Sequence, residues 1–306
     1  MNRMCKERSL GALWASAFTV ETLAIIIANV FSITIFWKRR IQLRRTRYLL
    51  LNLSVADLMF GVANLFELVV MKMRKPLFLT GTSLWEEHVT FEDIFGSASI
   101  FFLVLVSLER LFAMAWPFRL RTVSARSYFK VIGACWLFAG LVALIEQMVV
   151  FKLISHLSYV WLVSVSCFVC LTLITCSYSL IWVLNKKEDP RLPANCRKHN
   201  KELAKTLFLV TLLSLMAWLP FIIINFGRFI VEENGGDMLT FLCHPSKFLL
   251  LANSLINPII YSFRMPEFRR AINGTIICLG ERSRFRILKE SATNSIVLIS
   301  VRSFSI

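Results

Sequence analysis

The chain has 306 residues, of which 57% are hydrophobic and only 18% are charged, and its mean hydropathy is +0.64. Soluble domains average about 45–50% apolar and about 25% charged residues, so this composition excludes an ordinary soluble protein. The net charge of +16 would suit a nucleic-acid-binding protein, but the basic residues lie between apolar segments, which excludes nucleic acid as a partner.

Seven apolar segments are long enough to cross a bilayer as helices, which takes about 20 residues each. They occupy roughly residues 12–37, 47–71, 89–116, 129–151, 157–184, 203–231 and 245–263. The links between them leave no room for a separate soluble domain. We therefore predict an all-α membrane protein, a single bundle of seven transmembrane helices.

Basic residues mark every second link of this bundle. The links after the first, third, fifth and seventh segments are rich in Lys and Arg, whereas the other links are mixed or acidic. Basic loops face the cytoplasm under the positive-inside rule. We therefore expect a multi-pass plasma-membrane protein with its N-terminus outside and its C-terminus in the cytoplasm.

Polar residues in the first three segments occupy positions that lipid cannot solvate. Asn29 lies in the first segment and Asp57 in the second, where a carboxylate is costly without a partner. In the third segment Glu92 and Ser99 are seven residues apart, and Arg110 lies eleven beyond Ser99, so the three share one helix face. We expect that face to point into the bundle.

The later segments differ from the earlier ones by their prolines. Only residues 151–157 separate the fourth segment from the fifth. In the sixth segment Pro220 follows Trp218 closely, and a proline within a helix produces a kink that suits a moving part. The seventh segment combines a proline with amides, hydroxyls and a phenol within three turns: Asn253, Ser254, Asn257, Pro258 and Tyr261.

A short amphipathic stretch follows the seventh segment. Pro266 precedes apolar residues at helical spacing with Arg269 and Arg270 between them, which predicts a helix lying on the inner membrane surface. The predicted organisation is an extracellular N-terminus at 1–11, the transmembrane domain at 12–263, this surface helix at 264–280 and a disordered cytoplasmic tail at 281–306. Cys278 is a candidate for acylation.

The eight cysteines and four histidines have no metal-ligand spacing. Cysteines inside the helices are expected to act as small apolar residues. Only Cys5 and Cys243 are expected on the oxidising side, so they form a candidate disulfide. No nucleophile–base pair stands out, so we expect no enzyme. A transporter is the weaker alternative, because its repeats would place broken helices in both halves of the chain.

Taken together, these residues resemble the rhodopsin-like (class A) G protein-coupled receptors over the whole seven-helix region. The matching positions are Asn29, residues 53–57, Glu109–Arg110–Leu111 in place of Asp-Arg-Tyr, Trp136, Tyr178, residues 218–220 and residues 257–261. Each motif alone is weak, but all of them occur in the family's order on the expected helices. The resemblance implies a receptor for an extracellular small ligand or peptide that activates heterotrimeric G proteins. Further partners implied are membrane lipids and, through the tail, arrestin and receptor kinases.

The resemblance also implies a sodium site and an activation switch. The sodium ion would be held in mid-bundle, beneath Trp218, by Asp57, Ser99, Asn253, Ser254 and Asn257. A water-filled hydrogen-bond network without an ion is the alternative, and we expect no other cofactor. The switch residues, which couple the outward movement of helix six to the G protein, are Glu109, Arg110, Tyr178, Pro220, Asn257, Pro258 and Tyr261. Asn200 stands where an acid often pairs with Arg110, so we expect raised basal signalling.

Three departures from the family's usual pattern resemble the melanocortin receptors and their lipid- and nucleoside-sensing relatives. Trp85 stands near the usual helix-three cysteine, Cys170 stands about where helix five has a proline, and the second extracellular loop is very short. The resemblance also argues against retinal as the ligand. Retinal-binding members of the family need a lysine seven residues before Pro258 to form a Schiff base, and Leu251 occupies that position.

The ligand pocket is expected between helices two, three, six and seven. Its predicted lining residues are Glu67, Glu92, Asp93, Trp218, Phe221, Asn225 and Lys247. An acidic mouth favours a cationic ligand, either a peptide or an amine. Two alternatives stay open: a lipid or nucleoside ligand, and a purely structural pairing in which Glu92 or Asp93 binds Lys247 or Arg228.

Overall fold

The computed structural model describes residues 2–38, 46–73, 90–186 and 236–264, with shorter stretches at 205, 208–209, 212–214, 216–224, 227, 268–270, 272 and 274. In this part of the chain all regular elements are helices, without a strand. They are α1 (Asn2–Lys38), α2 (Thr46–Met73), α3 (Thr90–Ala115), α4 (Pro117–Thr122), α5 (Ala125–Val150), α6 (His156–Lys186) and α8 (Gly236–Arg264). Residues 212–214 and 216–224 are also helical.

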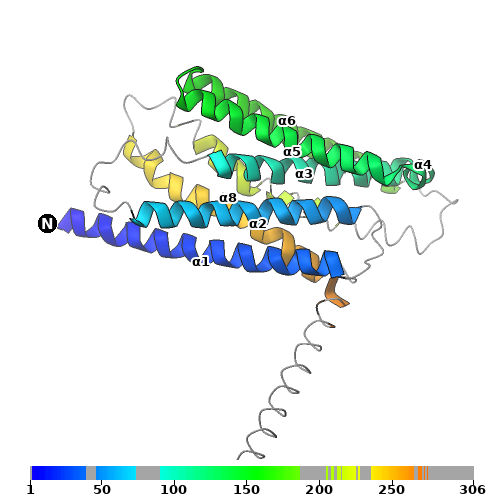
Figure 1. Cartoon of the computed structure of the whole chain (residues 1–306), viewed down its shortest axis with the longest axis horizontal. Coiled ribbons are helices and arrows are strands. Elements are labelled where there is room, and N and C mark those ends of the chain that lie inside the picture. Colours follow the sequence, from blue (N-terminus) through cyan, green and yellow to red (C-terminus); the bar gives the residue numbers. More distant parts are fainter. Residues whose placement is uncertain are drawn as a thin grey trace, which may run out of the picture.

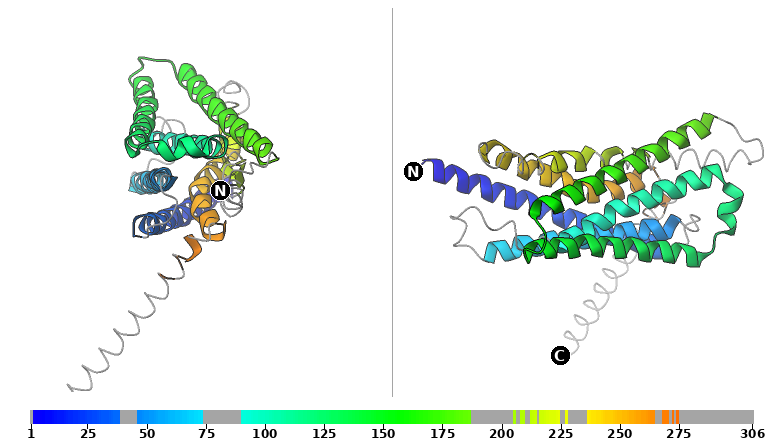
Figure 2. Two further views of the ribbon diagram at one scale, coloured as in Figure 1. Left: turned by 90° about the vertical axis from the view of Figure 1, so that its right-hand side faces the viewer. Right: turned by 90° about the horizontal axis from the view of Figure 1, so that it is seen from above.

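The long helices lie side by side in an elongated bundle (Figure 1, Figure 2). The central helix is α3, which packs against α2, α5 and α6, while α1 packs against α2 and α8. This arrangement confirms the predicted all-α fold class. Because α3 has neighbours on several sides, its polar side chains can reach different helices.

Five of the described helices are long and apolar enough to cross a membrane. The membrane-length portions are Gly11–Trp37, Thr46–Val69, Phe91–Ala115, Ala125–Val149 and Leu157–Leu184. A shorter apolar helix, Leu212–Ile224, lies within the sixth predicted segment, and α8 covers the seventh. All seven predicted segments therefore coincide with described helix, the sixth over part of its length.

Two helices begin about ten residues earlier than the hydrophobic pattern predicts, and α5 begins four residues earlier, at Ala125. The first helix starts at Asn2 instead of residue 12, because neither a proline nor a glycine interrupts residues 2–10. The seventh starts at Gly236 instead of residue 245, and Pro245 lies inside it. The short helix α4 was not predicted at all; Pro117 occupies its first turn, where a missing N–H costs little.

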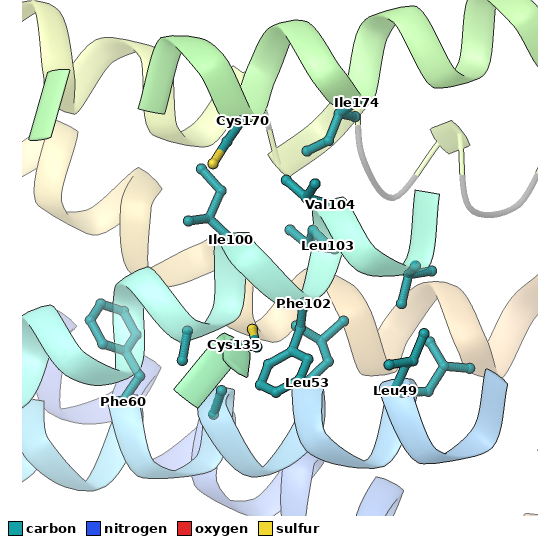
Figure 3. Packing of buried hydrophobic residues seen from close by; sticks show 14 of the residues in the cluster. Leu49, Leu53, Phe60, Ile100, Phe102, Leu103, Val104, Cys135, Cys170 and Ile174 are labelled. Atoms are coloured by element: carbon teal, nitrogen blue, oxygen red, sulfur yellow. The ribbon is translucent and has the colours of Figure 1, made fainter. Parts of the chain in front are cut away.

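The core lies where α3 meets α2, α5 and α6 (Figure 3). Leu53 on α2 and Phe102 on α3 are completely buried there, next to the buried Cys135 on α5. On the other side of α3, Ile100 lies close to Cys170 on α6. Cys135, Cys167 and Cys170 are therefore part of the apolar core, as their sequence context predicts.

Large apolar side chains also cover the outside of the bundle. Phe138 and Leu137 on α5 and Trp161 and Phe168 on α6 are each more than half exposed. In a soluble protein so many exposed aromatic and aliphatic groups would be unfavourable, whereas lipid solvates them. The exposed faces of α5 and α6 are thus suited to a bilayer.

The connection between α5 and α6 is a tight turn of residues 151–155, which confirms the very short loop expected from the sequence. Lys152 has a φ of 58°, the left-handed conformation that often ends a helix. Its N–H donates to the carbonyl of Val149 at 2.8 Å. Ser155 then accepts from the N–H of Ser158 at 3.2 Å and so begins α6.

Candidate functional site

A buried carboxylate occupies the middle of the bundle, at Asp57 on α2, which is completely shielded from solvent. Its Oδ1 accepts hydrogen bonds from the hydroxyls of Ser99 on α3 at 2.7 Å and Ser254 on α8 at 2.9 Å. Its Oδ2 accepts from the amide of Asn257 on α8 at 2.8 Å. The structure thus brings together four of the five residues expected around a sodium ion.

The fifth residue, Asn253, is also buried, but its Oδ1 has no hydrogen-bond partner within the described residues. The indole Nε1 of Trp218 is likewise buried without a partner among them. A third amide extends this polar region to α1, because Asn29 Nδ2 donates to the carbonyl of Ser254 at 3.0 Å. In this region the Asp57 carboxylate accepts several hydrogen bonds, whereas Asn253 Oδ1 and Trp218 Nε1 have no partner among the described residues.

Nearer the N-terminal end of α3, three charged side chains form one cluster, which we call the Lys247 triad. The Nζ of Lys247 on α8 lies 2.9 Å from Glu67 Oε2 on α2 and 3.2 Å from Glu92 Oε2 on α3. All three side chains are mostly buried, with exposures of 13%, 16% and 12%. Three of the predicted pocket residues, one lysine and two acids, thus meet directly. With both carboxyl groups ionised, the triad carries a formal charge of −1.

Asp93 does not join this triad, although it follows Glu92 directly in the sequence. It points toward α6, where it accepts a hydrogen bond from the hydroxyl of Tyr159. The carboxyl group of Glu146 on α5, which is buried to 93%, is in hydrogen-bond contact with Asp93 as well. Sequence reasoning did not assign Glu146 to a site. The sequence signal that could have identified Glu146 is that it is the one acid in an otherwise uncharged stretch of a membrane segment, residues 131–150.

About one turn beyond Glu92 and Asp93 on α3, two aromatic rings pack closely against the backbone of Gly96. A Cβ at this position would lie 3.3 Å from Phe60 and 3.7 Å from Trp218, so a larger side chain would crowd both rings. Phe221 is partly buried against the core, one turn further along the same helix as Trp218. The remaining predicted pocket residue, Asn225, lies outside the described residues.

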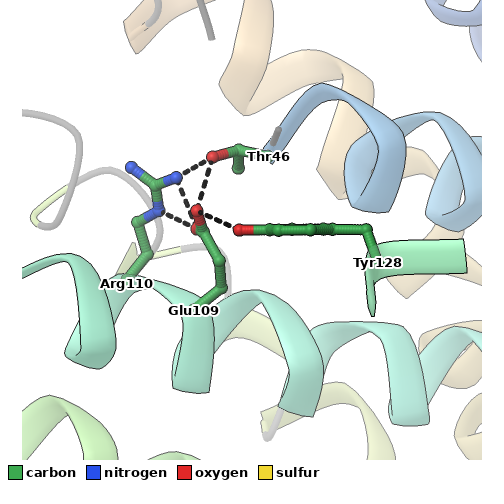
Figure 4. A network of polar contacts seen from close by, with 4 residues as sticks. All are labelled: Thr46, Glu109, Arg110 and Tyr128. Carbon is green, nitrogen blue, oxygen red and sulfur yellow. Dashed lines mark hydrogen bonds and ion pairs between the residues drawn. The ribbon is translucent and has the colours of Figure 1, made fainter. Parts of the chain in front are cut away.

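Near the C-terminal end of α3, Glu109 and Arg110 form a closed polar network with α2 and α5 (Figure 4). Arg110 Nε donates to Glu109 Oε2 at 2.7 Å, and Arg110 Nη2 donates to the hydroxyl of Thr46. That hydroxyl donates in turn to Glu109 Oε1 at 3.0 Å, and Tyr128 donates to the same oxygen at 3.5 Å. Thr46 and Tyr128 carry no sequence signal that would have revealed these contacts.

The other predicted switch residues pack into the inner half of the bundle. Tyr178 on α6 is buried with its ring edge-on to Phe208 at 5.5 Å. Tyr261 on α8 is completely buried between Phe36 and Phe268, and its hydroxyl has no partner among the described residues. The remaining switch positions are helical: Pro258 in α8 and Pro220 in residues 216–224.

Three further positions singled out from the sequence fall outside what the structure describes. Cys278 and Asn200 lie in undescribed stretches, and the side chain of Cys5 is undescribed as well. Cys243 is buried in α8. The disulfide between Cys5 and Cys243, the acylation of Cys278 and the raised basal signalling expected from Asn200 therefore stay predictions.

A bundle of membrane-length helices with a buried mid-bundle aspartate and an Arg110 network at one end defines a seven-transmembrane receptor. The family model of the 7 transmembrane receptor (rhodopsin family) matches residues 28–261, and the chain belongs to this family. It is therefore a rhodopsin-like G protein-coupled receptor, not an enzyme, and a multi-pass plasma-membrane protein that responds to extracellular ligands.

Several characterised receptors resemble the chain over most of its length. Sphingosine 1-phosphate receptor 4 of Mus musculus is 27% identical over 86% of this chain and 69% of its own. Adenosine receptor A3 of Canis lupus familiaris is 25% identical over 82% and 87%. Melanocortin receptor 5 of Mus musculus is 23% identical over 93% and 89%. These relatives have different ligands in their names, so family membership leaves the ligand class open.

Proposed function

We propose that this receptor binds a cationic extracellular ligand, a peptide or an amine, in the outer half of the bundle between α2, α3, α8 and the helix of Trp218. The observation that carries the proposal is the Lys247 triad. It gathers one side chain from each of α2, α3 and α8 at the predicted position of the ligand. Binding there can therefore change how three helices are held together.

The charge of the triad supports a cationic ligand. Two carboxylates outnumber one ammonium group, so a second cation is attracted and an anion is repelled. All three groups are largely buried, and electrostatic interactions are stronger in such surroundings than in water. An arriving ammonium or guanidinium group would pair with Glu92 or Glu67 and loosen the hold of Lys247 on that helix.

A lipid- or nucleoside-sensing receptor is the second candidate function. It is favoured by the similarity to a sphingosine 1-phosphate receptor and to an adenosine receptor. An anionic group of such a ligand would need Lys247 as its partner. The two candidates therefore depend on different groups of the triad. A cationic ligand requires the carboxylates of Glu67 and Glu92, whereas an anionic ligand requires the ammonium group of Lys247.

The test is a second-messenger assay in transfected cells with a panel of basic peptides, amines, lysophospholipids and nucleosides. For a cationic agonist, Glu92→Gln and Glu67→Gln are expected to lower potency, and Lys247→Gln to preserve or raise it. For an anionic agonist, Lys247→Gln abolishes the response. Glu21→Gln is the matched control, since Glu21 is a buried carboxyl group on α1 outside the triad. An agonist indifferent to all three triad variants would contradict the proposed site.

We further propose that Asp57, Ser99, Asn253, Ser254 and Asn257 hold a sodium ion that favours the inactive arrangement. The hydroxyl and carboxylate oxygens at Asp57 suit a hard cation, and the unpartnered Oδ1 of Asn253 adds another oxygen. A cation there would compensate a carboxylate that the bilayer interior otherwise disfavours. A network of water molecules is the alternative occupant.

The proposed output is activation of a heterotrimeric G protein by outward movement of the helix that contains Pro220. Arg110 is tied to Glu109 and Thr46, so its release from this network would expose it at the inner end. Tyr178, Tyr261, Asn257 and Pro258 are the proposed partners in that rearrangement. We place residues 1–11 outside the cell and residues 281–306 in the cytoplasm, where the tail would meet arrestin and receptor kinases.

A further inference from the structure

A second buried polar cluster lies where α3 faces α5 and α6, away from α8 and the Lys247 triad. It consists of Asp93 on α3, Tyr159 on α6 and Glu146 on α5, which we call the Asp93 cluster. Tyr159 donates a hydrogen bond to Asp93, and the carboxyl group of Glu146 is in hydrogen-bond contact with it. The second carboxyl oxygen of Glu146, Oε2, is buried without a hydrogen-bond partner within the described residues. Neither the proposed ligand contacts nor the sodium site uses this cluster.

The Asp93 cluster contains two acids and no base. In the sequence, Glu146 is the only charged residue between Val131 and Val150 on α5, and residues 157–184 of α6 contain none. Lys152 in the connecting turn is exposed, and Lys247 on α8 already binds Glu67 and Glu92. Within the described part of the chain, neither Asp93 nor Glu146 forms an ion pair with a cation.

Two carboxyl groups in hydrogen-bond contact cannot both be ionised away from water, because like charges repel and burial disfavours each of them. One proton must therefore remain between them. Tyr159 donates to Asp93, which stabilises the negative charge on that residue and leaves the proton on Glu146. The other charged or titratable groups facing the cluster are Glu92 on α3, Cys167 on α6 and, at longer range, the ammonium group of Lys247 on α8, which favours a negative charge on Asp93. The charge of Glu92 adds to the repulsion, and Cys167 is an uncharged thiol in the core.

We propose that Asp93 and Glu146 form a proton-binding site through which extracellular pH controls the packing of α5 and α6 against α3. With the proton bound, Glu146 donates to Asp93 and the helices stay together. When the proton leaves, two adjacent carboxylates repel each other and require water. Because the turn of residues 151–155 ties their outer ends, α5 and α6 then move away from α3 together.

The direct test measures the proton itself, by infrared spectroscopy of the purified receptor in lipid nanodiscs. We expect a carbonyl-stretch band of a protonated carboxylic acid that disappears as the pH is raised and is absent from Glu146→Gln. Glu21→Gln is the control, because it removes another buried carboxyl group, on a helix that packs against α2 and α8 instead. If the titrating band is the same in the wild type and in Glu146→Gln, so that their difference spectrum is empty, the proposal is overturned.

The functional test follows second-messenger output against extracellular pH. A one-proton switch changes the ratio of two arrangements by up to about tenfold per pH unit. Glu146→Gln keeps a donor to Asp93 at every pH, so its output should stay at the level that the wild type shows in acid. Tyr159→Phe removes a donor to the Asp93 carboxylate, so the midpoint should move to higher pH.

The two tests separate this inference from the proposed function. The infrared measurement needs neither an agonist nor a G protein, so a wrong ligand class leaves it intact. If the wild type and Glu146→Gln give the same pH profile in cells, the proposed control of helix packing is overturned, whatever ligand the receptor binds. The Tyr159→Phe shift supplies a second readout should Glu146→Gln reach the membrane poorly.

Discussion

Asn257 on α8 donates a hydrogen bond to Asp57 on α2 at 2.8 Å, and this single contact joins residues 200 positions apart. Ser99 and Ser254 donate to the other carboxylate oxygen, so α3 is tied into the same centre. A carboxylate that three helices share is well placed to sense how those helices are arranged. The first prediction concerns this centre.

We expect Asp57→Asn to abolish any effect of sodium on ligand-free G protein activation. The substitution keeps the size of the side chain and most of its hydrogen bonds but removes the charge that holds a cation. The measurement is nucleotide exchange in membranes, with sodium chloride exchanged for potassium chloride at constant ionic strength. Sodium should lower the activity of the wild type only. Equal sodium effects in both proteins would favour the water-filled network instead.

Arg110→Ala is expected to abolish G protein activation, because it removes the proposed contact with the G protein. Thr46→Ala is expected to do the opposite and raise ligand-free activity. The threonine hydroxyl accepts from Arg110 and donates to Glu109, so its loss removes one of the two restraints on Arg110 and leaves only the contact with Glu109. Basal second-messenger output at matched surface expression checks both. A Thr46→Ala receptor with less basal output than the wild type would show that the network does not restrain Arg110.

Lys247→Gln is expected to destabilise the receptor more than Glu92→Gln. Removing one partner of a buried ion pair costs about 3–5 kcal/mol, since a charge is left buried and uncompensated. Loss of Lys247 leaves two facing carboxylates, whereas loss of the Glu92 charge leaves a balanced pair with Glu67. Thermal unfolding of the purified variants in one detergent measures the difference. The double variant Lys247→Gln/Glu92→Gln should recover part of the loss, and additive effects would contradict direct coupling.

Gly96→Leu is expected to lower thermal stability and displace the indole of Trp218. A Cβ at Gly96 already lies 3.3 Å from Phe60 and 3.7 Å from Trp218, so a larger side chain cannot be accommodated without movement of the rings. Gly133→Leu on α5 is the matched control, because nothing lies within 4 Å of a Cβ at that position. Comparable unfolding temperatures for the two variants would show that the rings yield easily. Tryptophan fluorescence reports the displacement independently.

Much of this arrangement could be predicted because a bilayer imposes strong constraints on a sequence. The seven apolar segments coincide with described helix, the sixth over part of its length, and the shared face of Glu92, Ser99 and Arg110 points at α2 and α8 as its spacing indicates. Asp57 stood out because a carboxylate in lipid requires a partner. These inferences depend on periodicity and on the cost of burying charge, and both can be read from the chain alone.

Contacts that depend on the rotation and separation of neighbouring helices could not be predicted in this way. Glu92 and Asp93 are adjacent, and nothing in the sequence indicates that Glu92 contacts Lys247 while Asp93 contacts Tyr159. The hydroxyl of Thr46 is one of many near helix ends, and only packing selects it as the partner of Arg110. The helix starts at Asn2 and Gly236 were also missed. Residues 2–10 are mostly polar and carry no membrane-length hydrophobic signal, and the seventh predicted segment begins at Pro245, which lies inside the helix.

The turn between α5 and α6 has a kinetic consequence for ligand exchange. Five residues, 151–155, span at most about 18 Å when fully extended, and here they form a compact turn between two helix ends. A connection of this length cannot fold across the mouth of the bundle. A ligand approaching over α5 and α6 therefore meets no lid from this loop, and its entry rate would be set by diffusion and by the negative charge within. Its residence time would then depend on the contacts at the Lys247 triad.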